Sequence, residues 1–234
     1  MTVKPLYLLA DSQLLFWRDK GRLFTSRILE DMEPGNTRAA YIGASNGDDP
    51  QFYDLFLAAM QMIELSDCRL IPAEPSGEDR DFLERAGLVL LSGGDVERGW
   101  RVWERNGLKD AILKKRYDAT VMVGVSAGAV QLGLGALPES PQPQRLDLFR
   151  FAPFFIGSHE EEDDWWNLRA LVNLSQSEER GIGIPAGAGA VYLPDGTVEP
   201  VRKPLVEFSK QDGKLNESLL LPPATAPLNL GPDS

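Results

Sequence analysis

The chain has 234 residues, 43% of them hydrophobic and 25% charged, a balance that is ordinary for a globular protein. Its formal net charge of −11 and isoelectric point of about 4.7 argue against a nucleic-acid partner. No apolar run approaches the roughly 20 residues that a membrane span needs. The single cysteine, Cys68, excludes an intrachain disulfide. We therefore expect a cytoplasmic protein with no membrane partner.

The first half of the chain alternates short aliphatic runs with stretches of helical spacing. We expect strands at residues 6–9, 38–42, 68–71 and 88–91, and helices at residues 21–32, 51–65, 79–85, 96–105 and 108–116. This alternation predicts right-handed βαβ units, and so an α/β fold with a mostly parallel sheet and helices on both faces. We expect one catalytic domain over residues 1–221 and a flexible tail at 222–234.

A Gly-Val-Ser-Ala-Gly step follows the β-branched run at 121–123 and leads into small helix-forming residues. A strand that turns sharply into a helix at a serine crowds its neighbours, so it needs small residues on both sides. The hydroxyl then stands clear of the sheet at its carboxyl edge. We interpret residues 124–128 as a nucleophile elbow, with Ser126 as the candidate nucleophile.

The strand at 88–91 ends in Ser-Gly-Gly-Asp, which is the second candidate element. Paired glycines at the carboxyl end of a buried strand let the backbone approach a ligand closely. We expect the backbone N–H groups of Gly94 and Ala127 to form an oxyanion hole. A plain tight turn, with Asp95 as a helix N-cap, is the alternative interpretation of this segment.

The only histidine, His159, follows an aromatic-rich strand at 149–156 and is the one candidate for a general base that activates a serine. A carboxylate usually orients such a histidine. We favour Glu139, in a proline-rich loop after the elbow, and keep Asp147 and Glu160 as alternatives. A helix at 165–174 follows, and then strands at 181–184, 189–193, 198–201 and 205–208, which we expect as an antiparallel meander on the edge of the main sheet.

Four features in this order resemble the dipeptidase E / cyanophycinase family of serine peptidases. They are Leu-Ser-Gly-Gly-Asp at 91–95, Gly-Val-Ser-Ala-Gly-Ala at 124–129, a strand ending in His159 with Arg169 on the next helix, and Gly-Ile-Gly-Ile at 181–184. The resemblance implies a fold like that of class I glutamine amidotransferases, with Ser126 as nucleophile, His159 as base and no metal or cofactor. It implies a serine peptidase that hydrolyses short peptides. The chain departs from the family after His159, where an acidic run replaces Phe and spaced arginines.

We expect Asp95, Glu160 and Arg169 to contribute to substrate binding. The acidic run at 160–164 has two interpretations: a solvated helix N-terminus, or part of the site. If it faces the site, its potential disfavours an aspartyl side chain and favours a cationic group. Cyanophycinase-like cleavage of β-aspartyl-arginine bonds and a non-catalytic binding module are the alternative functions. A homodimer is compatible with the sequence.

Overall fold

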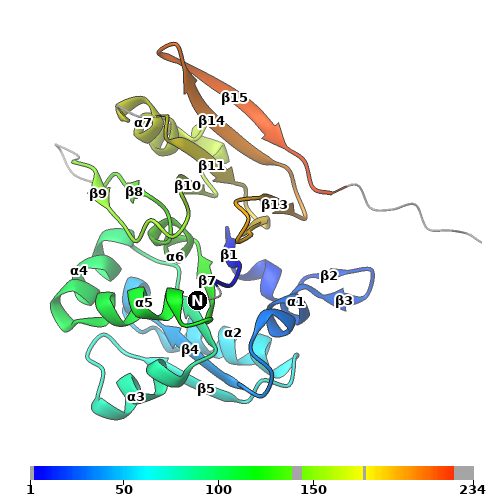
Figure 1. Cartoon of the computed structure of the whole chain (residues 1–234), viewed down its shortest axis with the longest axis vertical. Coiled ribbons are helices and arrows are strands. Elements are labelled where there is room, and N and C mark those ends of the chain that lie inside the picture. The colour runs from blue at the N-terminus through cyan, green and yellow to red at the C-terminus, as the bar shows by residue number, and fades with distance from the viewer. Residues whose placement is uncertain (1–2, 139–143, 176–177, 224–234) are drawn as a thin grey trace, which may run out of the picture.

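The computed structural model describes residues 3–138, 144–175 and 178–223. Its centre is a seven-stranded sheet in the order β13-β12-β1-β7-β6-β4-β5 (Figure 1). Five strands pair in parallel: β1 (Leu6–Leu9), β7 (Val121–Val125), β6 (Leu88–Leu91), β4 (Arg38–Ile42) and β5 (Asp67–Ile71). An antiparallel hairpin, β12 (Gly189–Tyr192) and β13 (Val198–Val201), extends the β1 edge. The predicted α/β class with a mostly parallel sheet is confirmed.

Helices cover both faces of this sheet because successive residues of each strand point to opposite sides. Leu6 and Leu8 of β1 belong to one buried cluster, whereas Tyr7 and Leu9 belong to another. The first cluster is covered by α3 (Gly77–Arg85), α4 (Val96–Asn106), α5 (Leu108–Tyr117) and α6 (Ala127–Gln131). The second is covered by α1 (Phe24–Asp31) and α2 (Pro50–Gln61). Almost every residue of β1, β7, β6 and β4 is therefore buried, as their aliphatic sequences predict, whereas only Ile71 of the edge strand β5 is buried.

A second, four-stranded sheet lies beside the first, in the order β10-β11-β14-β15. It consists of β10 (Phe154–Ser158), β11 (Arg180–Ile184), β14 (Leu205–Gln211) and β15 (Lys214–Leu220). Helix α7 (Trp166–Leu174) packs on it through Leu168 and Val172, against Phe155 and Phe208 (Figure 1). The C-terminal antiparallel strands are thus present, but their expected position on the main sheet is corrected, because only β12 and β13 join that sheet.

The expected helix at 21–32 is shorter than predicted. A small hairpin, β2 (Arg18–Asp19) and β3 (Arg22–Leu23), precedes it, and α1 begins only at Phe24. Lys20 and Gly21 both have positive φ, 47° and 84°, which is the backbone of a tight two-residue hairpin turn. The remaining short elements are η1 (Ser12–Leu15), η2 (Ala44–Asn46), η3 (Glu161–Asp163), β8 (Gly135–Ala136) and β9 (Leu146–Asp147).

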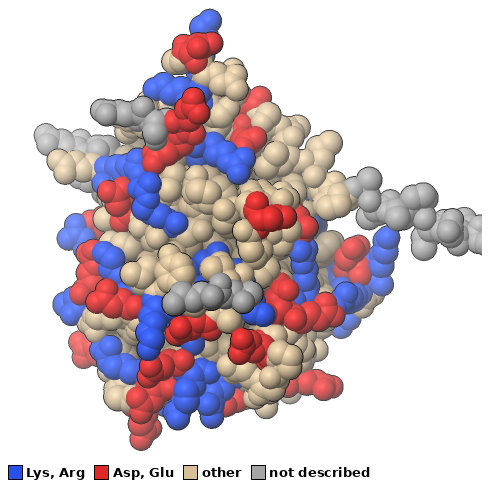
Figure 2. Space-filling view, in the orientation of Figure 1, with Lys and Arg blue, Asp and Glu red and all other residues tan. Residues whose placement is uncertain are grey.

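Acidic and basic side chains are interspersed over the face of the molecule that Figure 2 shows, and no broad basic patch forms there. None of the helices in the described part of the chain is both long enough and apolar enough to cross a membrane. Most of the expected C-terminal tail, residues 224–234, lies outside the described residues.

Candidate active site

Ser126 stands at the junction of β7 and α6 with φ 50° and ψ −114°, a backbone conformation that non-glycine residues seldom adopt. The two flanking glycines explain how this turn fits. A Cβ on Gly124 would lie 2.5 Å from the carbonyl oxygen of Gly128, and a Cβ on Gly128 would lie 2.1 Å from that of Leu91. Both positions therefore exclude any side chain. The strand, the sharp turn at the serine and the helix occur where the motif predicts them; that this turn serves as a nucleophile elbow stays a prediction.

His159 lies opposite this serine, and its Nε2 is 2.8 Å from the Ser126 hydroxyl oxygen. The histidine directly follows β10 and has φ 47°, and its backbone N–H donates to the carbonyl of Ile184 at 2.9 Å. The preceding residue, Ser158, is buried and donates its hydroxyl to the carbonyl of Ala10 at 3.1 Å. The two sheets thus meet at this point, and their contact brings the serine and the histidine together.

The Gly93–Gly94 turn at the end of β6 lies beside the elbow. A Cβ on Gly93 would be 3.3 Å from the Cβ of Ser126. Gly94 has φ 127°, and a Cβ there would lie 2.3 Å from the carbonyl oxygen of Ser45, so only glycine fits. The N–H groups of Gly94 and Ala127 have no acceptor among the described residues; Ala127 directly follows Ser126, and Gly94 follows Gly93, which lies beside Ser126. These are the two donors that the sequence predicts for an oxyanion hole.

A buried polar pair, not foreseen from the sequence, holds this turn in place. Gln131 of α6 is fully buried, and its Nε2 donates to the carbonyl of Val96 at 2.9 Å and to the Ser45 hydroxyl at 3.1 Å. The Ser45 carbonyl in turn accepts the N–H of Asp95 at 2.9 Å. The elbow helix is therefore tied to the residues directly after Gly94. The sequence signal that could have indicated this buried pair is Gln131 itself, a polar residue that directly follows the small apolar residues 127–130.

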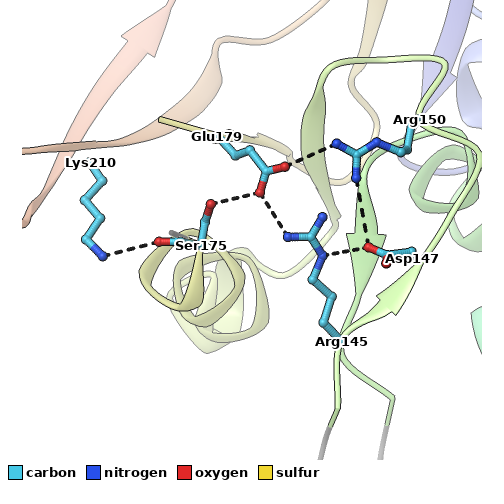
Figure 3. A network of polar contacts seen from close by, with 6 residues as sticks. All are labelled: Arg145, Asp147, Arg150, Ser175, Glu179 and Lys210. Atoms are coloured by element: carbon cyan, nitrogen blue, oxygen red, sulfur yellow. Dashed lines mark hydrogen bonds and ion pairs between the residues drawn. The ribbon is translucent and has the colours of Figure 1, made fainter. Parts of the chain in front are cut away.

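Asp147, one alternative for the orienting acid, is engaged elsewhere. It pairs with Arg145 at 3.0 Å and with Arg150 at 4.0 Å, and both arginines also contact Glu179 (Figure 3). Glu179 further accepts the Ser175 hydroxyl at 2.8 Å. This network links β9 to the segment before β11, and it leaves Asp147 without a contact to His159. Asp147 is therefore corrected as the acid that orients His159, because its carboxylate pairs with two arginines instead.

Glu160 follows His159 but does not bond to its imidazole either. One carboxylate oxygen accepts the N–H of Leu168, in the first turn of α7, at 3.3 Å. Within the described ranges, no carboxylate forms a hydrogen bond or ion pair with His159. Glu139, the favoured acid, lies outside the described residues, so its orienting role stays a prediction.

A cavity of about 470 Å³ opens beside the elbow. Gly94, Asp95 and Glu160 are among its lining residues. Asp95 also caps α4, because its carboxylate accepts the N–H of Arg98 at 2.9 Å. Asp95 is therefore a helix cap that also borders the cavity, and its contribution to substrate binding stays a prediction.

Arg169 does not line this cavity, and its expected role in substrate binding stays a prediction. Its guanidinium pairs with Glu217 at 3.2 Å and Asp164 at 3.6 Å, and it lies 5.2 Å from the Phe208 ring centre. We assign it to packing between α7 and the β14–β15 hairpin.

The residues of the acidic run at 160–164 do not all lie at the cavity. Glu160 alone of residues 160–164 lines the cavity. Glu161 accepts the N–H of Ala186 at 2.8 Å instead. Trp165, next in the chain, is buried against the second sheet, where a Cβ on Gly183 would lie 2.7 Å from its ring.

Burial raises the pKa of Glu160 from 4.5 to about 7, against a smaller opposite effect of the Leu168 N–H. Because this pKa lies above the unfolded value of 4.5, the contribution of Glu160 to stability is full below pH 4.5 and is lost as the pH rises through 7. We expect Glu160→Gln to be more stable than the wild type by about 1–3 kcal/mol at pH 8.5. The two proteins should be equal near pH 4.5. Urea denaturation of both proteins at pH 4.5 and pH 8.5 measures their unfolding free energies. If the difference between the variant and the wild type is the same at the two pH values, the prediction is contradicted.

The fold is shared with two solved structures. A peptidase from an acI-B1 Actinobacterium superposes with a TM-score of 0.68 at 15% identity, covering 94% of this chain and 95% of that one. A candidate peptidase E from Listeria monocytogenes EGD-e has a TM-score of 0.63 at 16% identity, covering 86% and 99%. Curated proteins gave no match. The sequence model of Peptidase family S51 matches residues 8–199, which is most of the chain. The chain therefore belongs to peptidase family S51, the dipeptidase E family that its motifs resemble.

Proposed function

We propose that this peptidase is of the serine type and hydrolyses short peptides through an acyl-enzyme on Ser126, with His159 as general base. The single observation that carries the proposal is the 2.8 Å separation of the Ser126 hydroxyl oxygen and His159 Nε2 at a strained strand-to-helix turn. This is hydrogen-bond distance, as proton transfer to the imidazole requires.

The chemistry follows from the surrounding groups. The Ser126 hydroxyl gives its proton to His159 as its oxygen attacks the peptide carbonyl carbon. The negative charge that forms on the carbonyl oxygen is stabilised by the N–H groups of Gly94 and Ala127. His159 then passes the proton to the leaving amine, and a water molecule releases the acyl group by the reverse sequence. The fixed N–H groups need no reorganisation during the reaction.

Two parallel assays test this proposal: labelling of the protein with a fluorophosphonate probe, and cleavage of a peptide library. The purified protein is treated with the probe, and mass spectrometry of its digest identifies the modified residue. In parallel, the protein is incubated with dipeptides and tripeptides, with and without prior labelling. We expect modification at Ser126 and loss of cleavage in proportion to it. An unlabelled Ser126, with no cleavage, would instead support the binding-module alternative.

The buried pair behind Gly94 gives a second test. Gln131→Met keeps the side-chain volume but leaves the Val96 carbonyl and the Ser45 hydroxyl without their donor. We expect a loss of about 1–3 kcal/mol in unfolding free energy. Because the turn at Gly94 loses its anchor, we also expect about a tenfold fall in kcat with little change in KM.

The matched control is Gln51→Met, at an exposed position of α2. It should leave the unfolding free energy, kcat and KM unchanged. A Gln131→Met protein that is less stable but keeps the wild-type kcat would show that the pair serves the fold alone.

A further inference from the structure

The cavity beside the elbow has the size of a site for one amino-acid side chain and its neighbouring backbone. Its volume is about 470 Å³, and it begins at Gly94 and Asp95, which follow Gly93, the residue that lies beside Ser126; Ser126 and His159 themselves do not line it. A peptide whose carbonyl oxygen is held by the Gly94 N–H therefore has a side chain beside the scissile bond within reach of this cavity.

One side of the cavity is aliphatic, and most of the rest of its lining is polar. The aliphatic side is formed by side chains from α6, β8 and the residues after it, β9, β10 and α7: Val130, Ala136, Leu137, Pro138, Leu146, Ile156 and Leu171. These side chains suit the methylene stem of a long side chain, since burial of each methylene group is favourable. Among the described lining residues there is no cationic partner for an anionic side chain.

Among the described residues that line the cavity, the charged ones are all carboxylates: Asp95, Glu97 and Glu160. Glu97 pairs with Arg101 of its own helix. Asp95 already accepts the helix N–H of Arg98.

Glu160 differs from both. It accepts only the Leu168 N–H, and no Lys or Arg contacts it anywhere in the described residues. Its carboxylate is largely withdrawn from water, which raises its pKa to about 7. A buried carboxylate without a cation is unfavourable, and a bound cation would offset that cost.

We propose that this cavity binds a lysine or arginine side chain of the peptide substrate, with Glu160 as its counter-ion. The inference rests on the proposed function, because it places the cation on the substrate of Ser126. The aliphatic side contacts the stem, and the carboxylate at the α7 end receives the ammonium or guanidinium group. An aspartyl side chain is disfavoured here by charge repulsion.

The test compares lysine with norleucine, which has the same unbranched stem but no charge, on either side of the scissile bond in dipeptides. Three proteins are measured: wild type, Glu160→Gln and Glu162→Gln. The first substitution keeps an oxygen that can accept the Leu168 N–H, so the cap on α7 is retained. Glu162 is an exposed acid of the same run that does not line the cavity, and it serves as the matched control.

We expect the wild type to prefer lysine over norleucine by about tenfold or more in kcat/KM on at least one side of the bond. Glu160→Gln should lose this preference, mainly through slower cleavage of the lysine substrate. Glu162→Gln should behave as the wild type. Equal cleavage of the two substrates by the wild type, or a preference that survives in Glu160→Gln, would overturn the inference.

Calorimetric titration with lysine amide and norleucine amide repeats the comparison without turnover. Tighter binding of lysine amide to the wild type than to Glu160→Gln supports the cavity assignment, even if Ser126 proves inert. Probe labelling of Ser126 together with equal binding of both amides would contradict the inference and leave the proposed function intact.

Discussion

Ser126→Ala is expected to abolish peptide hydrolysis while leaving the fold intact. The substitution removes the nucleophilic oxygen, so kcat/KM should fall by about 10⁴-fold or more. Alanine keeps the Cβ, so the strained backbone at φ 50° gains no new clash. The lost contact is with an exposed histidine, whose Nε2 can bond to water instead. The unfolding free energy should therefore change by less than about 0.5 kcal/mol.

The measurement is a progress curve on the best dipeptide from the library, beside thermal denaturation of the same sample. Ser66→Ala, at an exposed serine before β5, is the matched control and should retain full activity. Cleavage that persists in Ser126→Ala would place the active site elsewhere. Loss of activity together with a large drop in melting temperature would mean that the fold, and not the nucleophile, had been lost.

The proximity of Ser126 and His159 was predictable because its sequence signals are local and rare. The elbow needs a strand, two small residues around a serine and a helix, and all three stand within residues 121–131. His159 is the only histidine, so a serine that works through imidazole has a single partner. What the sequence could not supply was the distance, which depends on how the second sheet meets the first.

The pairing of the C-terminal strands was less predictable, for a physical reason. A period-two pattern shows which face of a strand is buried but does not select the strand beside it. Strands β11 and β12 follow one another closely in the chain, yet β11 pairs with β10 and β12 pairs with β1. The polar sequence of β15 gave no strand signal, because most of its residues are exposed.

The sequence likewise did not show which partners the acidic residues near the site would have. Asp147 and Glu160 were equivalent in the sequence, since each is a carboxylate near a predicted strand end. They differ only in their partners: Asp147 pairs with two arginines, whereas Glu160 lines the cavity and pairs with no Lys or Arg among the described residues. Likewise, Gln131 could be placed on the elbow helix, but its bond to the Val96 carbonyl depends on a tertiary contact with α4.

Gly128→Ala is expected to be the most destabilising single-methyl addition to the elbow. Its Cβ would lie 2.1 Å from the Leu91 carbonyl oxygen, which is backbone in a central buried strand and cannot rotate away. Either α6 must move away from β6 or the strand must bend. We expect a loss of about 3–5 kcal/mol in unfolding free energy. Probe labelling of any folded fraction should also fall, because the same shift moves Ser126 away from His159.

Gly77→Ala is the matched control, since it makes the same change at the first residue of α3, where a Cβ would meet nothing within 4 Å. It should be neutral or stabilise the protein by up to about 1 kcal/mol, because alanine restricts the unfolded chain more than glycine does. Urea denaturation of the two variants beside the wild type gives the comparison. If Gly128→Ala stays within 1 kcal/mol of Gly77→Ala, the elbow tolerates a side chain, and close packing of α6 on β6 is not what holds Ser126 in its strained conformation.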